Sequence, residues 1–249
     1  MLMSQTTATV ILNYGIKERK KFVHTISVHT GNAAIYAGAP KYTYTIGEYL
    51  VDKAGNLSYP SDADYEKISQ LVSKLRDFGY EVKDSDISDS TNPHNLVVEI
   101  PNNEFSHEAI DNLQKIIASK ESVFKKALGS SNLDITITEN KLSFPWFTFS
   151  GDIAEANAYV QFVCALCNMA KSQKRVTAKE QSEPVENEKF IMRLFLVRLD
   201  FKGEDYKIAR KVLLSNLSGN GSWRYGQPPK KAHTSKENKN IPDHEGIAH

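Results

Sequence analysis

Three cations share one face of an expected helix near residue 210, and a glycine-rich turn, an indole and a guanidinium follow it. Lys207, Arg210 and Lys211 stand at positions i, i+3 and i+4, which places them on one side of a helix. The turn at residues 219–221 offers backbone N–H groups to an anion, and the two residues after it add a stacking ring and a phosphate-binding fork. The pattern is typical either of a solvated basic helix face or of a surface that binds phosphate or an acidic protein. The candidate residues are Lys207, Arg210, Lys211, Trp223 and Arg224.

A second group of interest is acidic. Residues 61–111 carry twelve acids and four bases, a net charge of −8, whereas residues 171–231 carry fourteen bases and seven acids, a net charge of +7. Such an asymmetry indicates either two binding faces of opposite sign or two regions that pack near each other. If the acidic region binds a partner, its carboxylates imitate nucleic-acid phosphates toward a basic cleft. The candidate acidic residues are Asp62, Asp64, Asp84 and Asp86.

The residue combinations that enzymes use are missing from the sequence. Cys164 and Cys167 form a CxxC motif inside an apolar helical run, and no second pair completes four zinc ligands, so two core cysteines are expected. Asp84, Asp86 and Asp89 have the spacing of a calcium loop without its glycine or its terminal glutamate. No HExxH, GxSxG or GxxxxGK[ST] motif is present. We therefore expect a protein that binds rather than catalyses and that uses no cofactor or metal. An enzyme acting on nucleotides or RNA is a third alternative.

The composition is that of a globular protein with a real core. Of 249 residues, 40% are hydrophobic and 24% are charged. No run of eighteen apolar residues occurs, and the first residues lack the basic and apolar regions of a secretory signal. Two cysteines fit a reducing compartment. These features predict a cytoplasmic protein without a membrane partner, and they leave its oligomeric state open.

The elements that position the candidate residues follow an α+β pattern. Two small mixed modules are expected, of the orders β-α-β-hairpin-α and β-α-β-β, followed by a helical C-terminal module and a disordered tail. The predicted domain limits are 1–83, an acidic linker at 84–95, 96–150, a basic helical module at 151–226, and the tail at 227–249.

Within these modules, β-branched runs predict the strands, and apolar residues at helical spacing predict the helices. Ser61 and Ser106 are read as helix N-caps, and Gly31, Gly79 and Gly129 as helix ends. The predicted strands are 8–13, 33–37, 42–46, 48–51, 56–59, 96–100, 133–138 and 141–149. The predicted helices are 17–30, 61–78, 106–128, 153–171 and 205–217.

Several segments together resemble a known family. YKIARKVLLSNLSGNGSWR behind FLVRLDF, with ESVFKKAL, KLSFPWF and SYPSDADYEKISQLVSKLRDFGYEV upstream, is similar to proteins of phages and integrative mobile elements of Gram-positive bacteria that are labelled virulence-related. The resemblance covers nearly the whole chain up to Tyr225. The family has no assigned catalytic or binding residues, so none is carried over.

The resemblance implies a cytoplasmic accessory protein of a mobile element in its bacterial host. Such genes often encode anti-defence proteins, for example anti-CRISPR inhibitors. The leading hypothesis is accordingly an inhibitor that binds a host nuclease or nucleoprotein through its charged surfaces. The alternative is direct DNA or RNA binding through the basic C-terminal helix.

Overall fold

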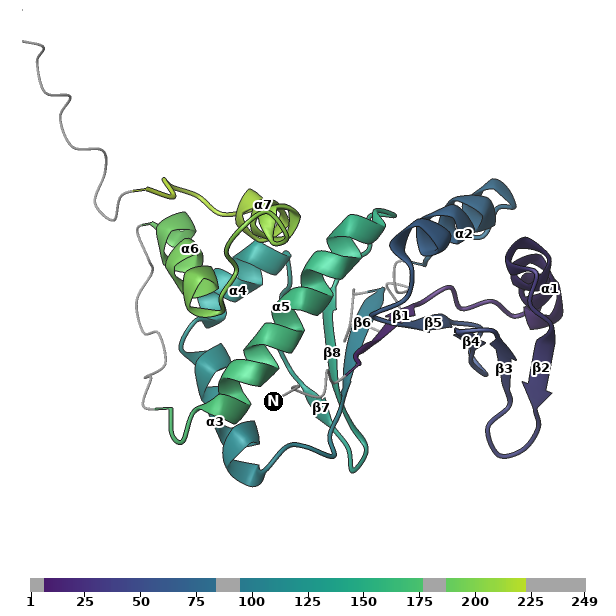
Figure 1. Cartoon of the computed structure of the whole chain (residues 1–249), viewed down its shortest axis with the longest axis horizontal. Helices are drawn as coiled ribbons and strands as arrows, with labels where there is room; N and C mark the ends of the chain where they lie inside the picture. Colours follow the sequence, from purple (N-terminus) through teal and green to yellow (C-terminus); the bar gives the residue numbers. More distant parts are fainter. Residues whose placement is uncertain (1–6, 84–94, 177–186, 223–249) are drawn as a thin grey trace, which may run out of the picture.

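The computed structural model describes residues 7–83, 95–176 and 187–222 (Figure 1). In these residues the chain forms seven helices and one eight-stranded antiparallel sheet, which confirms the α+β class. The strands are β1 (Thr9–Leu12), β2 (Ala34–Ala37), β3 (Thr43–Ile46), β4 (Tyr49–Val51), β5 (Leu57–Pro60), β6 (Leu96–Pro101), β7 (Thr136–Ile137) and β8 (Lys141–Phe147). The helices are α1 (Arg19–Thr30), α2 (Tyr65–Asp77), α3 (His107–Ala118), α4 (Glu121–Leu128), α5 (Ile153–Ser172), α6 (Glu188–Arg198) and α7 (Lys207–Ser215).

The strands of the first two expected modules belong to one sheet. Its order is β2-β3-β4-β5-β1-β6-β8-β7, so β1 lies between β5 and β6. Residues 84–94, which include most of the expected linker, lie outside the described residues, but the strands that flank this region meet because Val10 is the register partner of Val98. The expected tail at 227–249 also lies outside the described residues. One hydrophobic core includes residues from all three expected modules.

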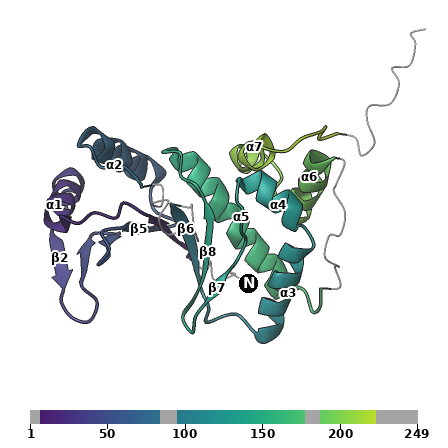
Figure 2. The same cartoon turned by 180° about the vertical axis from the view of Figure 1, so that it is seen from behind.

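Alternation along the strands separates the two faces of the sheet. Val10 and Leu12 are buried, whereas Ile11 between them is only half-buried. The same period of two recurs in β5 and β6, where Tyr59 and Val98 point to the core. Helices α1, α2 and α5 cover the buried side, and α3, α4, α6 and α7 gather around α5 at one end of the molecule (Figure 1 and Figure 2).

The start of α2 differs from the sequence expectation. Asp64 is the N-cap, and its Oδ1 accepts a hydrogen bond from the backbone N–H of Glu66 at 3.0 Å. Ser61 instead donates its backbone N–H to the Ala8 carbonyl at 2.7 Å, so it belongs to the turn that follows β5. The Ser61 cap prediction was wrong because the helix begins only after Asp64, whose carboxylate accepts from the first free N–H groups of the helix.

The expected helix 106–128 is two helices, α3 and α4. The chain turns at Lys120, whose φ of −133° is not helical. The turn directs Phe124 into an aromatic cluster with Phe162 of α5 and Phe195 of α6, at ring distances of 5.3 Å in both cases. Packing of these rings is a tertiary effect that periodicity along one segment does not contain. The Ser106 cap is confirmed, since its side chain accepts from the Ala109 N–H.

The expected strand 133–138 is shortened to β7. The Asp134 carbonyl accepts a hydrogen bond from the Trp146 indole N–H at 2.8 Å, before pairing with β8 begins at Thr136. The C-terminal region is helical as predicted, although α7 begins and ends two residues inside the expected limits. The apolar segment near residue 190 is a third helix of this region, α6.

Candidate functional site

The CxxC motif lies inside the core, as the sequence predicts. Cys164 is half-buried and Cys167 is buried on α5, and neither forms a disulfide. Burial raises the pKa of the Cys164 thiol to about 11 and raises that of Cys167 further. Both thiols therefore stay protonated and unreactive near neutral pH. In the described ranges no group of three or more metal-ligating side chains comes together, and no helix is long and apolar enough to cross a membrane.

The C-terminal cations are less free than their spacing indicates. Lys207 forms an ion pair with Glu204 at 3.0 Å. One terminal nitrogen of Arg210 donates to the carbonyls of Phe201 and Gly203 at 3.1 and 2.8 Å, so this guanidinium fixes the loop before α7. Lys211 is exposed. The apolar side of the helix is as predicted, with Ala209 and Leu213 buried.

The glycine-rich turn at residues 219–221 packs against the start of α6. The Asn187 side-chain oxygen accepts from the Asn220 N–H at 3.2 Å, and the Ser218 carbonyl accepts from the Lys189 N–H at 3.1 Å. At least one amide that was expected to face an anion is therefore used inside the protein. Trp223 and Arg224 lie outside the described residues. The arrangement of the five C-terminal candidates as a set therefore stays a prediction, and the described residues show only that Lys207 and Arg210 have partners within the protein.

Two of the four acidic candidates lie in the segment just before α2. Asp62 is exposed in the turn before α2, whereas Asp64 is occupied as the helix cap and lies 3.7 Å from Lys67. Asp84 and Asp86 lie outside the described residues. Other carboxylates of the acidic region have local partners: Glu99 pairs with Lys141, Glu104 with Lys171, and Asp111 with Lys115.

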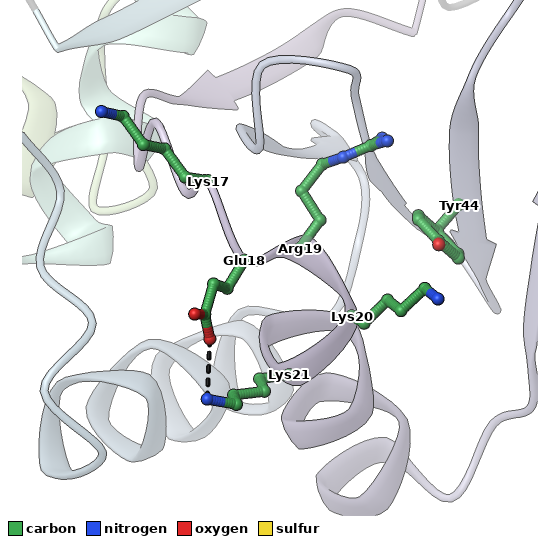
Figure 3. Close-up of a pocket in the computed structure, with 6 residues that line it drawn as sticks. All are labelled: Lys17, Glu18, Arg19, Lys20, Lys21 and Tyr44. Carbon is green, nitrogen blue, oxygen red and sulfur yellow. Dashed lines mark ion pairs between the residues drawn. The ribbon is translucent and has the colours of Figure 1, made fainter.

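Cations and tyrosines do converge at the opposite end of the sheet. We call this set the basic–tyrosine surface. An open cavity of about 460 Å³ lies there, lined by the start of α1 and one tyrosine of β3 (Figure 3). The segment from residue 17 to residue 53 carries six bases and three acids. The members of the surface are Lys17, Arg19, Lys20, Lys21, Tyr36, Tyr42, Tyr44 and Lys53.

Arg19 is the organising residue of this surface. Its Nη1 donates to the Tyr42 carbonyl at 2.7 Å and to the Asp52 carbonyl at 3.1 Å. Its guanidinium carbon lies 5.4 Å from the centre of the Tyr44 ring. Both hydrogens of Nη1 are thus used, and no described residue accepts from Nε or Nη2. The free edge is the fork that pairs with two oxygens of a phosphate.

Tyr42 is presented by a constrained backbone. Its φ of 51° lies in the left-handed region, which a residue with a side chain rarely adopts. The hydrogen bond from Arg19 to its carbonyl and the bond from its own N–H to the Gly38 carbonyl at 3.0 Å hold it there. The Lys53 ammonium lies 5.4 Å from the centre of the Tyr42 ring, which is 39% exposed. Lys53 and Tyr42 therefore form a second cation–π pair on this surface, in addition to Arg19 and Tyr44.

Unpaired positive charge lies on both sides of the cavity. Arg19 and Lys20 extend toward the side of Tyr44, whereas Lys17 extends away from it (Figure 3). Glu18 pairs with Lys21 at 2.7 Å, and the hydrogen bond and charge of Lys21 lower the pKa of the Glu18 carboxyl. That pair is neutral at pH 7. The unpaired positive charge among the described residues of the cavity accordingly lies at Lys17, Arg19 and Lys20.

The sequence contains a signal for this surface that the expectation missed. Four of the five residues from Lys17 to Lys21 are cationic, and three tyrosines follow between residues 36 and 44. A basic run near aromatic strands is a pattern of nucleic-acid binding. Tyr36 and Tyr44 become neighbours through the β2–β3 register, which pairs them directly.

Comparison with known proteins gives no relative from which a role transfers. No protein-family model matches the sequence, and no curated protein and no solved structure matches it significantly.

Proposed function

We propose that the protein acts by binding nucleic acid at the basic–tyrosine surface rather than by catalysis. A polyanion fits this surface because three cations of the cavity have no carboxylate partner among the described residues. Tyrosine rings lie between the cations and offer flat faces on which nucleobases stack. This feature favours nucleic acid over an acidic protein as the ligand. The virulence-related family resemblance is compatible with such a role in an accessory protein of a mobile element.

The observation that carries the proposal is the fixed orientation of Arg19. A guanidinium held by two carbonyls at one nitrogen loses little further freedom when its other edge binds a phosphate. Lys20 extends on the same side of the cavity and adds a second charge near that edge (Figure 3). Arg210 of α7 is held by two carbonyls at one nitrogen in the same way. What distinguishes the basic–tyrosine surface is the Tyr44 ring beside the Arg19 guanidinium, whereas on α7 Lys207 is paired with Glu204.

The test compares two variants that remove the same charge at opposite ends of the protein. Lys20→Gln with Lys53→Gln removes two cations from the proposed site, and Lys207→Gln with Lys211→Gln removes two from the C-terminal helix. Fluorescence anisotropy with labelled DNA and RNA oligonucleotides, repeated from low to high salt, measures both. The first variant should bind more weakly, and its slope of log K against log salt should fall by about 0.7 to 0.9 for each phosphate that is no longer neutralised. The second should bind like the unaltered protein.

Absence of salt-dependent binding to any oligonucleotide at low salt would refute the proposal. Loss of binding in the C-terminal variant alone would assign nucleic-acid binding to α7 instead. Circular dichroism of both variants controls for folding, which we expect to be unchanged because exposed charges contribute about 0.5 kcal/mol or less each.

Inhibition of a host nuclease or nucleoprotein is the other candidate role, and it rests on the family resemblance and the charge asymmetry of the sequence. A pull-down from bacterial lysate, with and without nuclease treatment, separates it from direct nucleic-acid binding. A protein partner retained after nuclease treatment supports an inhibitor. A partner lost on nuclease treatment is bridged by nucleic acid and supports the site proposed above.

A further inference from the structure

We infer that the nucleic acid is single-stranded and that one of its unpaired bases stacks on the exposed face of Tyr36, at the open edge of the sheet. The inference deepens the proposed function and rests on it. It follows from the order in which Arg19, Tyr44 and Tyr36 lie beside one another.

These three side chains form a column. The Arg19 guanidinium lies over the Tyr44 ring at 5.4 Å, and the rings of Tyr44 and Tyr36 have centres 4.6 Å apart with a tilt of 38°. Arg19 reaches Tyr44 from the side of β4, since it also binds the carbonyl of Asp52 just beyond that strand. Tyr36 reaches it from the other side, because β2 is the opposite neighbour of β3. Tyr44 is thus enclosed between a cation and a second ring.

The aromatic end of the column, at Tyr36, lies at the open edge of the sheet. β2 is the outermost strand of the sheet, and in the described residues no further strand or helix pairs with its free edge (Figure 1). Tyr36 is 48% exposed, although its ring contacts Tyr44. A flat aromatic group that joins the column at this end therefore stacks on the outer face of Tyr36. A nucleobase is such a group, and offset stacking on a tyrosine ring is favourable for every base.

The phosphate-binding edge of Arg19 and the outer face of Tyr36 lie on opposite sides of two rings, since the guanidinium is 5.4 Å from the centre of the Tyr44 ring and that centre is 4.6 Å from the centre of the Tyr36 ring. A base beyond Tyr36 and a phosphate at Arg19 and Lys20 consequently belong to different nucleotides of one strand. The ligand is an oligonucleotide rather than a free nucleotide.

A duplex does not satisfy both ends of the column. Inside a duplex, paired bases are stacked on each other and show only their edges in the grooves, so the faces of all but the two terminal pairs are inaccessible to a side chain. Away from its ends, a duplex would engage the cations alone. A strand with unpaired bases engages the cations and Tyr36 together, which gives it the advantage at this site.

The experiment measures binding of a labelled single-stranded oligonucleotide, of a blunt duplex of the same sequence, and of AMP, by anisotropy and competition. Tyr36→Ala removes the stacking ring, Tyr36→Phe keeps the ring without the hydroxyl, and Ile35→Ala is the matched control. Ile35 directly precedes Tyr36 in β2 and is 68% exposed, and its side chain points to the opposite face of the sheet. Circular dichroism checks that each variant folds.

Tyr36→Ala should weaken binding of the single strand by about 5- to 150-fold, the range expected for loss of one stacked base. Tyr36→Phe and Ile35→Ala should bind it like the unaltered protein, and the duplex and AMP should bind more weakly than the single strand. Single-strand binding that is unchanged in Tyr36→Ala, or a duplex that binds at least as tightly, overturns this inference and leaves the proposed function standing if binding still depends on Lys20. Failure of every oligonucleotide to bind overturns both.

Discussion

Replacing Arg19 by lysine tests the basic–tyrosine surface most directly, because the substitution keeps the charge and removes the geometry. Arginine holds the Tyr42 and Asp52 carbonyls with one nitrogen and keeps its phosphate fork free. A lysine ammonium is one point donor on a flexible stem, so it does not serve the two carbonyls, the Tyr44 ring and a phosphate together.

The expected loss of binding free energy follows from the hydrogen bonds that the substitution removes. A hydrogen bond from a charged donor contributes about 1.5 to 3 kcal/mol when fully formed, and the half-buried position of Arg19 reduces this figure because water replaces part of it. We expect Arg19→Lys to cost about 1 to 2 kcal/mol of binding free energy, a five- to thirty-fold loss of affinity. The slope of log K against log salt should stay the same, since no charge is removed.

Two measurements check this expectation. Anisotropy titrations give the affinity and its salt slope for Arg19→Lys and for Lys20→Arg, a control that also keeps its charge. Hydrogen exchange follows the Tyr42 amide, which donates to the Gly38 carbonyl at 3.0 Å and should exchange faster once the Tyr42 carbonyl is released. Unaltered affinity and unaltered exchange in Arg19→Lys would refute the organising role of the guanidinium.

Two further predictions concern stability. Asn112 is 2% exposed, donates to the Ala170 and Gln173 carbonyls at 3.3 and 2.7 Å and accepts from the Val176 N–H at 2.8 Å. Asn112→Ala should therefore lower the free energy of unfolding, measured in urea, by about 3 to 5 kcal/mol. The control Asp111→Ala, on the exposed side of the same helix, should lower it by about 0.5 kcal/mol or less. Burial raises the pKa of the Glu188 carboxyl, but hydrogen bonds from Lys126 and Ser218 outweigh it and hold the pKa below its ordinary value. This stabilisation is therefore complete above the unfolded-state pKa and is lost as the pH falls through the lower folded-state pKa. Unfolding measured from pH 6 to pH 2 should show a shallower loss of stability in Glu188→Gln than in the unaltered protein.

Local signals predicted the elements and missed their arrangement. The buried alternation of β6 and the apolar face of α5 are visible in the sequence because each repeats within one segment. The pairing of β1 with β6 is not visible, since it joins residues as far apart as Thr9 and Glu99, ninety positions along the chain. The break at Lys120 was missed for a related reason, because distant aromatic rings determine it.

For the candidate site, too, local features were predicted from the sequence and long-range contacts were not. Helical spacing correctly placed Lys207, Arg210 and Lys211 on the polar side of α7, but it could not show that the loop before the helix folds its carbonyls onto Arg210. The basic run at Lys17–Lys21 was readable as charge alone. Its meaning depends on the strand register that sets Tyr36 beside Tyr44, and that register is a property of the folded sheet.

The central position of β1 has a consequence for the order of events during synthesis. β1 gains its β5 partner once residue 60 has been made, but its second edge stays unpaired until residues 96–101 follow. At a synthesis rate of about 5 to 20 residues per second, that edge is open for roughly 2 to 8 seconds. An apolar strand with free backbone groups is a template for pairing with other chains. The nascent protein is therefore most exposed to misassociation before its own sixth strand arrives, and a chaperone that protects it has to act within this interval.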